Sequence, residues 1–238
     1  MIFKKSDKIQ FVSTIEGLES IEESLPRPAK HFIPQWFKDI PSNVENSSTV
    51  KICPSFPDYF SQGYIIPMWS DVNLRYDKNG WFAESPLSLF PWDNHGNQQF
   101  LDYTDARFNG VKGQFVFKAV SPWRIITPPG WSVLQLPLFY HFNQEWSVLP
   151  GVVDTDTMHQ VNQQVLYHGN GKDIRINLGD PFVLYIPFKR SNKLKHEILY
   201  QTEEHRKLFS KLDLNMLQRF QPNGWYRQMQ RDRDKSER

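Results

Sequence analysis

Hydrophobic and polar residues alternate with a period of two along the middle of this chain. The alternation is clearest over residues 114–119, where Phe115, Phe117 and Ala119 would face one side of a strand. Short runs of this kind, separated by Pro, Gly and Asn, are typical of a β-sandwich or barrel. The pattern predicts strands at 50–53, 64–76, 114–120, 123–127, 131–136, 161–167, 174–176 and 182–188.

The two ends of the chain have helical patterns instead. An acidic amphipathic helix is expected over 15–23, and Pro34 is suited to open a short helix that carries Trp36 and Phe37. Near the C-terminus, Thr202 is a candidate N-cap for a helix with one apolar face. That face consists of Leu208, Phe209, Leu212, Met216, Leu217 and Phe220. It would dock either on its own domain or on another subunit.

These patterns together predict a mainly β protein of three segments. A helical N-terminal arm covers 1–47, a β-sandwich or distorted barrel covers 48–190, and a basic helical arm covers 191–238. The last 52 residues hold 13 Lys and Arg against 7 Asp and Glu, whereas the whole chain has a net charge of +2. Acidic residues interspersed in 231–238 argue against nucleic-acid binding and favour a solvated or protein-bound end.

Composition excludes several other classes of protein. The single cysteine, Cys53, cannot form an intramolecular disulfide or a thiolate zinc site. No stretch approaches the about 20 apolar residues that span a bilayer, and the N-terminus lacks the apolar core of a signal peptide. We therefore expect a protein without a membrane role, located in the host cytoplasm or in a virion.

The carboxylates Asp154 and Asp156 are the first candidates for chemistry. They lie two residues apart, so on a strand they would face the same side. Paired carboxylates can bind a divalent cation or divide the acid and base roles of an enzyme. Alternatively, the Asp-Thr-Asp sequence forms a turn that bonds its own backbone and caps the end of a strand.

Aromatic residues form a second candidate site. Trp92 and His95 lie in a polar, glycine-containing segment, and with Tyr140 and Trp146 they could present a ligand-binding face for a sugar or a base. Ordinary packing explains the same residues. A mononuclear iron site would need His141, His159 and one carboxylate to converge, but the His-x-Asp core of cupin-like oxygenases is missing. We predict no metal ligands.

Three central segments resemble the dUTPase and dCTP-deaminase superfamily. Residues 151–156 and 179–186 are similar to its third and fourth conserved stretches, and 127–131 is similar to the Pro-Gly turn before them. Residues 70–74 could stand where that superfamily carries its first Asp-Leu motif. The resemblance implies a dUTPase-like β-fold. It also implies that Asp154 contacts a sugar or positions water, that Asp156 assists, and that Mg²⁺ takes part if the protein hydrolyses nucleotides.

The chain departs from that superfamily where phosphate should be bound. The interval 136–150 holds no Arg or Lys, and Phe139, Tyr140, Phe142 and Trp146 stand there instead. Without cationic side chains the obvious binding energy for a triphosphate is lost. The glycine-rich C-terminal arm of trimeric dUTPases is also absent, so the fold can be shared while the chemistry is lost.

Nearly the whole chain also resembles an uncharacterised family of bacteria and tailed bacteriophages. The residues that carry this likeness include 51–54, 63–64, Trp131, 151–156 and 186–190. It implies a phage or bacterial source. We therefore expect a non-catalytic phage-type accessory or virion-associated protein, without a cofactor, that contacts copies of itself or phage structural proteins. The alternatives are a nucleotide hydrolase or deaminase-like enzyme and a cupin-like metal oxygenase.

Overall fold

The structure is a computed structural model that describes residues 8–77, 80–86, 92–95, 115–168, 173–191, 195–216 and 232. The chain divides into two compact units. The first comprises Met1–Phe32 and Gln62–Asn192, and the second comprises Ile33–Ser61 and Lys193–Arg238. The three segments predicted from the sequence, 1–47, 48–190 and 191–238, stay a prediction about domain limits.

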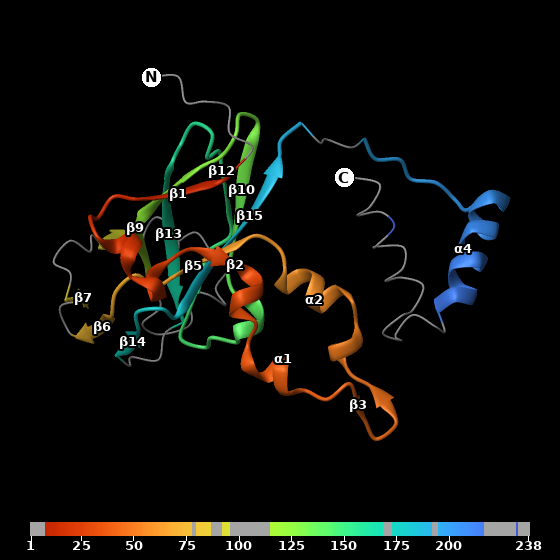
Figure 1. The fold of residues 1–238 in the computed structure, drawn as a ribbon, viewed down its shortest axis with the longest axis horizontal. Helices are drawn as coiled ribbons and strands as arrows, with labels where there is room; N and C mark the ends of the chain where they lie inside the picture. The colour runs from red at the N-terminus through yellow and green to blue at the C-terminus, as the bar shows by residue number, and fades with distance from the viewer. Residues whose placement is uncertain are drawn as a thin grey trace. The chain divides into compact units, whose positions relative to one another are not determined.

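The first unit contains two five-stranded antiparallel sheets (Figure 1). In the first sheet the strands have the order β1-β9-β13-β11, and β8 also pairs with β9. The strands of this sheet are β1 Gln10–Ser13, β8 Trp92–His95, β9 Phe115–Ile126, β11 Trp146–Val148 and β13 Gln160–Tyr167. In the second sheet the strands have the order β12-β10-β15-β5-β2. The strands of this sheet are β2 Arg27–Pro28, β5 Tyr64–Pro67, β10 Trp131–Leu136, β12 Gly151–Val153 and β15 Pro181–Lys189.

The described residues of this unit also form a third, smaller sheet. Its order is β14-β6-β7, with bounds Val72–Asp77 (β6), Gly80–Glu84 (β7) and Ile174–Ile176 (β14). The predicted mainly β class is therefore confirmed. The short segment between β1 and β2 forms two 3₁₀ helices, η1 Leu18–Ser20 and η2 Glu22–Ser24, where the sequence predicted one helix over 15–23.

One hydrophobic core joins the sheets. Alternate residues of β13, including Val161 and Val165, are buried together with Val133 of β10 and Phe182 of β15. Such side chains each stabilise the fold by about 1.5–3 kcal/mol relative to exposure. The period-two pattern read from the sequence therefore places the buried faces of two sheets against each other, which is the arrangement of a sandwich.

A buried polar chain crosses this core between the sheets. Gln163 of β13 donates from Nε2 to the Tyr185 hydroxyl at 2.7 Å, and that hydroxyl donates to Gln135 Oε1 of β10 at 2.8 Å. The Gln135 amide then donates to the Leu149 carbonyl at 2.9 Å. Burial raises the pKa of Tyr185, so the phenol stays neutral and can act as donor and acceptor.

Two strand predictions differ from the structure in where the strands begin and end. The runs 114–120 and 123–127 form the single strand β9, because Pro122 lies where β9 and β13 shift register between Gln160 and Asn162. A proline is tolerated at such a bulge because no ladder bond is required of it. In contrast, the run 64–76 is two strands, β5 and β6, which belong to different sheets.

The second unit is made of short elements. They are α1 Gln35–Asp39, β3 Asn43–Val44, β4 Ser47–Ser48, η4 Val50–Ile52, α2 Ser55–Phe60 and α4 Glu203–Met216. Phe37 of α1 packs on Phe56 and Phe60 of α2, with ring centroids 6.0 and 4.8 Å away. No helix within the described ranges has the length and apolarity needed to cross a membrane.

Side-chain caps decide two predictions in this unit. The predicted strand at 50–53 is wrong, because Thr49 caps a 3₁₀ helix there by accepting from the Lys51 amide at 3.3 Å. The predicted cap of the C-terminal helix is confirmed, since Thr202 Oγ1 accepts from the His205 amide at 3.3 Å. Of the predicted apolar face of that helix, Leu208 and Phe209 are exposed, and Leu217 and Phe220 lie outside the described residues.

Candidate functional site

The Asp154–Asp156 segment is a turn at the edge of a sheet. Strand β12 ends at Val153, and the amides of Thr157 and Met158 both donate to the Asp154 carbonyl, at 3.0 and 2.8 Å. The two aspartates therefore do not continue β12 as a strand, which was one of the two geometries considered for them. The alternative interpretation, in which an Asp-Thr-Asp turn bonds its own backbone at a strand end, agrees with this geometry.

Asp156 forms the closest charged contact of this turn. Its carboxylate faces the guanidinium of Arg190, with Oδ1 2.9 Å from Nη1 and Oδ2 2.5 Å from Nη2. The Gly130 amide also donates to Oδ2, at 2.8 Å, and only 8% of the side chain is exposed. The hydrogen bonds from Arg190 lower the pKa of Asp156, although burial opposes them, so the carboxylate is ionised at neutral pH.

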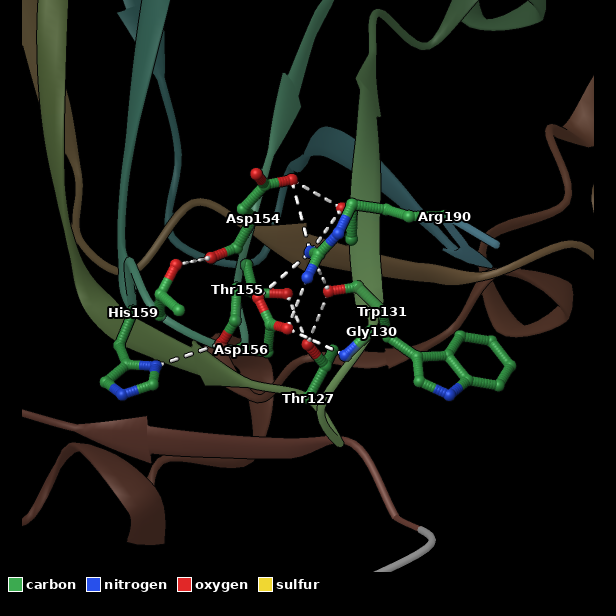
Figure 2. Close-up of polar contacts among 10 residues, drawn as sticks. Thr127, Gly130, Trp131, Asp154, Thr155, Asp156, His159 and Arg190 are labelled. Atoms are coloured by element: carbon green, nitrogen blue, oxygen red, sulfur yellow. Dashed lines mark hydrogen bonds and ion pairs between the residues drawn. The ribbon is translucent and has the colours of Figure 1, made fainter. Parts of the chain in front are cut away.

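Asp154 lies beside the same guanidinium but is open to solvent. Ser132 donates from its hydroxyl to Asp154 Oδ1 at 2.6 Å, and Arg190 Nη1 lies 3.3 Å from that oxygen. About half of the side chain, 54%, is exposed. Figure 2 shows both carboxylates directed toward Arg190, with the Trp131 ring directed away from them.

Arg190 connects three segments of its sheet. It follows β15, its amide donates to the Gly130 carbonyl at 2.9 Å, and its Nη1 also donates to the Trp131 carbonyl and the Ser132 hydroxyl, both at 2.9 Å. Its partnership with Asp156 raises its pKa, so it remains cationic. We call Asp154, Asp156, Arg190, Ser132 and Gly130 the aspartate–arginine clamp, because they join the ends of β12, β10 and β15.

A neutral hydrogen-bonded pair supports the clamp from inside. Thr127 and Thr155 are buried, and their hydroxyls lie 2.8 Å apart. His159 Nδ1 lies 2.9 Å from the Thr155 carbonyl, and the His159 carbonyl accepts from the Ile125 amide at 3.0 Å. His159 is therefore held by the turn and by β9.

The predicted aromatic ligand residues are placed only in part. Trp146 is buried and packs on Phe182 with ring centroids 5.1 Å apart, and Tyr140 lies in the 3₁₀ helix η7 Phe139–His141. Trp92 and His95 belong to β8 and pair with Ala119 and Val116, but their side chains lie outside the described residues. A shared ligand face made by these four residues stays a prediction.

The histidines form no metal-ligand cluster in the part of the chain that the structure describes. Within the described ranges, no three His, Cys, Asp or Glu side chains are grouped so that they could hold a metal ion. His141 and His159 are both inside those ranges, so the cupin-like alternative gains no support there. Burial lowers the pKa of His141, which makes the neutral imidazole its main form at pH 7.

The role of Arg190 could have been found only with the strand register. Trp131 is paired with Lys189 across β10 and β15, which brings Arg190 beside Gly130 although 60 positions separate them in the sequence. Arg190 enters the sequence analysis only within the family-like stretch 186–190, without a partner. The available signal was the opposite charge of two conspicuous segments, Asp154–Asp156 and Lys189-Arg190.

No family model and no curated protein sequence matches this chain. Similar solved structures are the dUTPase from phage phi11 of S. aureus, with 11% identity over 82% of this chain and 96% of the other and a TM-score of 0.37, and the Staphylococcus bacteriophage 80alpha dUTPase, with 9% identity over 83% and 98% and a TM-score of 0.38. The EIAV dUTPase matches with 10% identity over 59% of this chain and 86% of the other, at a TM-score of 0.34.

The matched structures are thus of the kind that the sequence motifs resemble. Their TM-scores lie below 0.5 and their identities near one residue in ten, so the likeness assigns neither an activity nor a site to this chain. The likeness to an uncharacterised bacterial and phage family stays a prediction, because no family model matches.

Proposed function

We propose that this protein is a non-catalytic phage-type accessory or virion-associated protein whose β-core is a scaffold for protein contacts. One observation carries the proposal: the aspartate pair that would perform nucleotide chemistry is bonded to Arg190 of the same chain. A clamp of this kind fastens three strand ends and leaves the cation nearest to the carboxylates without capacity for a phosphate.

Asp156 is poorly suited to catalysis for a physical reason. A general base or a metal ligand must offer lone pairs to its substrate or ion. Both oxygens of Asp156 already accept hydrogen bonds from Arg190, and one also accepts from the Gly130 amide. Its lowered pKa makes it a weak base, and its burial keeps substrates away.

The segment 136–150 has no cationic side chain that could bind a phosphate. The segment 136–150 contains no Lys or Arg, and its one histidine, His141, has a pKa lowered by burial. Nucleoside triphosphates are bound by charge-assisted hydrogen bonds from cationic forks, often with a metal ion. We therefore propose that residues 136–150 do not bind phosphate.

Exposed apolar side chains support a role in protein contacts. Ile198, Leu199 and Tyr200 are consecutive and exposed, and in the first unit Val152 and Met158 are exposed on either side of the clamp turn. Large apolar side chains gathered on a surface mark interaction sites in soluble proteins. We propose further copies of this chain or phage structural proteins as the partners.

A nucleotide hydrolase or deaminase-like enzyme is the second candidate, and Asp154 is the observation that favours it. This carboxylate is half exposed, and Ser132 and Arg190 hold one of its oxygens in a fixed direction. An oriented and accessible carboxylate can position water. Mg²⁺ would be the expected cofactor of such an enzyme.

Release of phosphate, pyrophosphate and ammonia from deoxynucleoside triphosphates with Mg²⁺ separates the two candidates. The protein is compared with its Asp154→Asn variant, which keeps the size of the side chain, and circular dichroism confirms that both are folded. We expect equal background release from both proteins. Turnover by the natural chain that Asp154→Asn abolishes would overturn the scaffold proposal and establish the enzyme.

A further inference from the structure

A cleft of about 700 Å³ lies in the first unit, apart from the aspartate–arginine clamp. Its lining includes Phe139, Asn143, Glu145 and Trp146 from one segment of the chain and Arg175 and Asp180 from another. None of the five clamp residues is among the described residues that line it. Its size falls within the range of about 300–1,000 Å³ that is typical of small-ligand sites.

Aromatic rings supply the apolar part of this cleft. Trp146 is buried and rests on Phe182 beneath it, so its position is fixed by the core. Phe139 and Phe142 also line the cleft, are 67% and 57% exposed, and have ring centroids 6.3 Å apart. The cleft therefore combines a rigid indole with phenyl rings that a ligand can reach.

The loop that carries these rings is held in an unfavourable conformation. Phe142 has φ of 52°, in the left-handed region, where a bulky side chain costs roughly 1–2 kcal/mol. Its amide donates to the Phe139 carbonyl at 3.2 Å, and the Asn143 side chain accepts from the amides of Glu145 and Trp146 at 2.9 and 3.2 Å. Strain that is retained in this way concentrates at functional positions.

The charges in the cleft exclude an anionic ligand. Arg175 is the one Lys or Arg among the described lining residues, and its guanidinium is bonded to Asp71 at 3.2 Å and to the Asn177 side chain at 2.9 Å. Glu145 and Asp180 add negative charge, and His141, which also lines the cleft, is neutral because burial lowers its pKa. A phosphate or carboxylate would therefore meet net repulsion.

The polar groups that remain suit a ligand with many hydroxyls. The Asn143 side-chain oxygen already accepts from the loop, so its NH₂ group is the part offered as a donor. The Gln144 amide contains a donor and an acceptor, and the carboxylate of Glu145 accepts. Hydroxyl groups both donate and accept, so they can bond to amides and carboxylates together. The C–H faces of a sugar ring are apolar and can cover exposed phenyl rings.

We propose that this cleft is a binding site for a neutral oligosaccharide, with Phe139 and Phe142 against the sugar rings and Asn143, Gln144 and Glu145 bonded to the hydroxyls. This site is additional to the scaffold function and does not depend on it. A saccharide site on such a protein would attach it to a glycan surface without any chemical step.

The test is isothermal titration of the full chain with maltotriose, cellotriose, mannotriose and the N-acetylglucosamine trimer. We expect at least one to bind in the range of about 1 mM or tighter, as for a shallow site with few contacts. Phe139→Ala should weaken that binding about tenfold or more. Phe82→Ala is the matched control, because it removes a similarly exposed phenyl ring from β7, outside the cleft lining.

Two further arms make the outcome decisive. Glu145→Ala should also weaken the saccharide, because it removes an acceptor without touching the core. Deoxyuridine is the competing neutral ligand, and we expect it to bind more weakly than the preferred saccharide. Failure of all four saccharides to bind, equal binding by Phe139→Ala, or a preference for deoxyuridine would each overturn the proposal.

Discussion

The aspartate–arginine clamp and the cleft lined by Phe139 and Trp146 lie at opposite ends of β15. The clamp is closed by its own charged contacts, whereas the cleft is open to a ligand. Arg190 follows the last residue of β15, and its charge is matched by Asp154 and Asp156 of the same chain. Pro181, the first residue of β15, lines the cleft, where phenyl rings and amides remain accessible. The residues that resemble a catalytic family are bonded internally, whereas the segment that departs from that family is open.

The contrast shows that residues which resemble a family motif need not be the residues that are open to a ligand. Residues 151–156 resemble an active-site motif, but their local structure gives the carboxylates a stabilising role. A site must be accessible to a ligand, and Phe139 and Phe142 of the segment 137–148 are exposed. Resemblance of a segment to a family motif is therefore not evidence of a site, which has to be argued from the contacts and exposure of its own residues.

The largest expected effect is the loss of the Asp156 carboxylate. Asp156→Ala leaves the Gly130 amide and the Arg190 guanidinium without their acceptor in a mostly buried position. We expect the free energy of unfolding, measured by urea denaturation, to fall by about 2 kcal/mol.

Asp154→Ala is the matched control for that experiment. Its carboxylate is half exposed, so we expect a loss below about 1 kcal/mol. Equal losses from the two alanine variants would contradict the distinction between a buried clamp residue and an exposed one.

The clamp also predicts how stability depends on pH. The folded-state pKa of Asp156 lies below its ordinary value of 3.8, so folding favours the ionised carboxylate. This contribution is complete above the unfolded-state pKa, and it is lost as the pH falls through 4 toward the lower folded-state pKa. Urea midpoints measured between pH 7 and pH 3 should fall less steeply for Asp156→Asn than for the natural chain. Parallel curves would show that Asp156 does not couple folding to protonation.

A smaller effect is expected from the turn that presents the Gly130 amide. Gly130 has φ of +81°, and an added Cβ would meet no atom within 4 Å. Gly130→Ala therefore tests backbone conformation without a clash, and we expect a loss of about 1 kcal/mol in thermal or urea unfolding. An unchanged stability would show that the turn relaxes without disturbing the clamp.

The smallest effect on stability is expected in the cleft. Phe139 is largely exposed, so Phe139→Ala should change the free energy of unfolding by less than about 0.5 kcal/mol, even though it should abolish most saccharide binding. Differential scanning calorimetry of Phe139→Ala and of the natural chain measures this change. A large loss of stability would show that Phe139 packs against the fold. The cleft would then contribute to stability, as the clamp does.

Several strands of the β-core could be predicted from the sequence, because they are short apolar runs between turn residues, and burial alternates along some of them. The predicted run 131–136 coincides with β10, and 174–176 coincides with β14, whose buried and exposed residues alternate. The predictions failed where a side-chain cap or a bulge outweighed the hydrophobic pattern. Thr49 turned the run 50–53 into a 3₁₀ helix, and the bulge at Pro122 let β9 continue.

The candidate site could be predicted only in part. The sequence brought Asp154 and Asp156 together, but the contacts with Arg190 and Gly130 depend on the pairing of β10 with β15. The cleft depends on two segments that are far apart in the sequence, around Trp146 and around Arg175. Neither local spacing nor residue type contains this information, since register and loop position are set by tertiary packing.

The most direct test of the central claim is nucleotide turnover by folded protein with an intact clamp and by Asp156→Asn. The structure assigns Asp156 to stability, so we predict no release of phosphate or pyrophosphate above background from either protein, together with a lower urea midpoint for Asp156→Asn. Turnover by the natural chain that disappears in Asp156→Asn, with an unchanged urea midpoint, would contradict the account and identify Asp156 as catalytic.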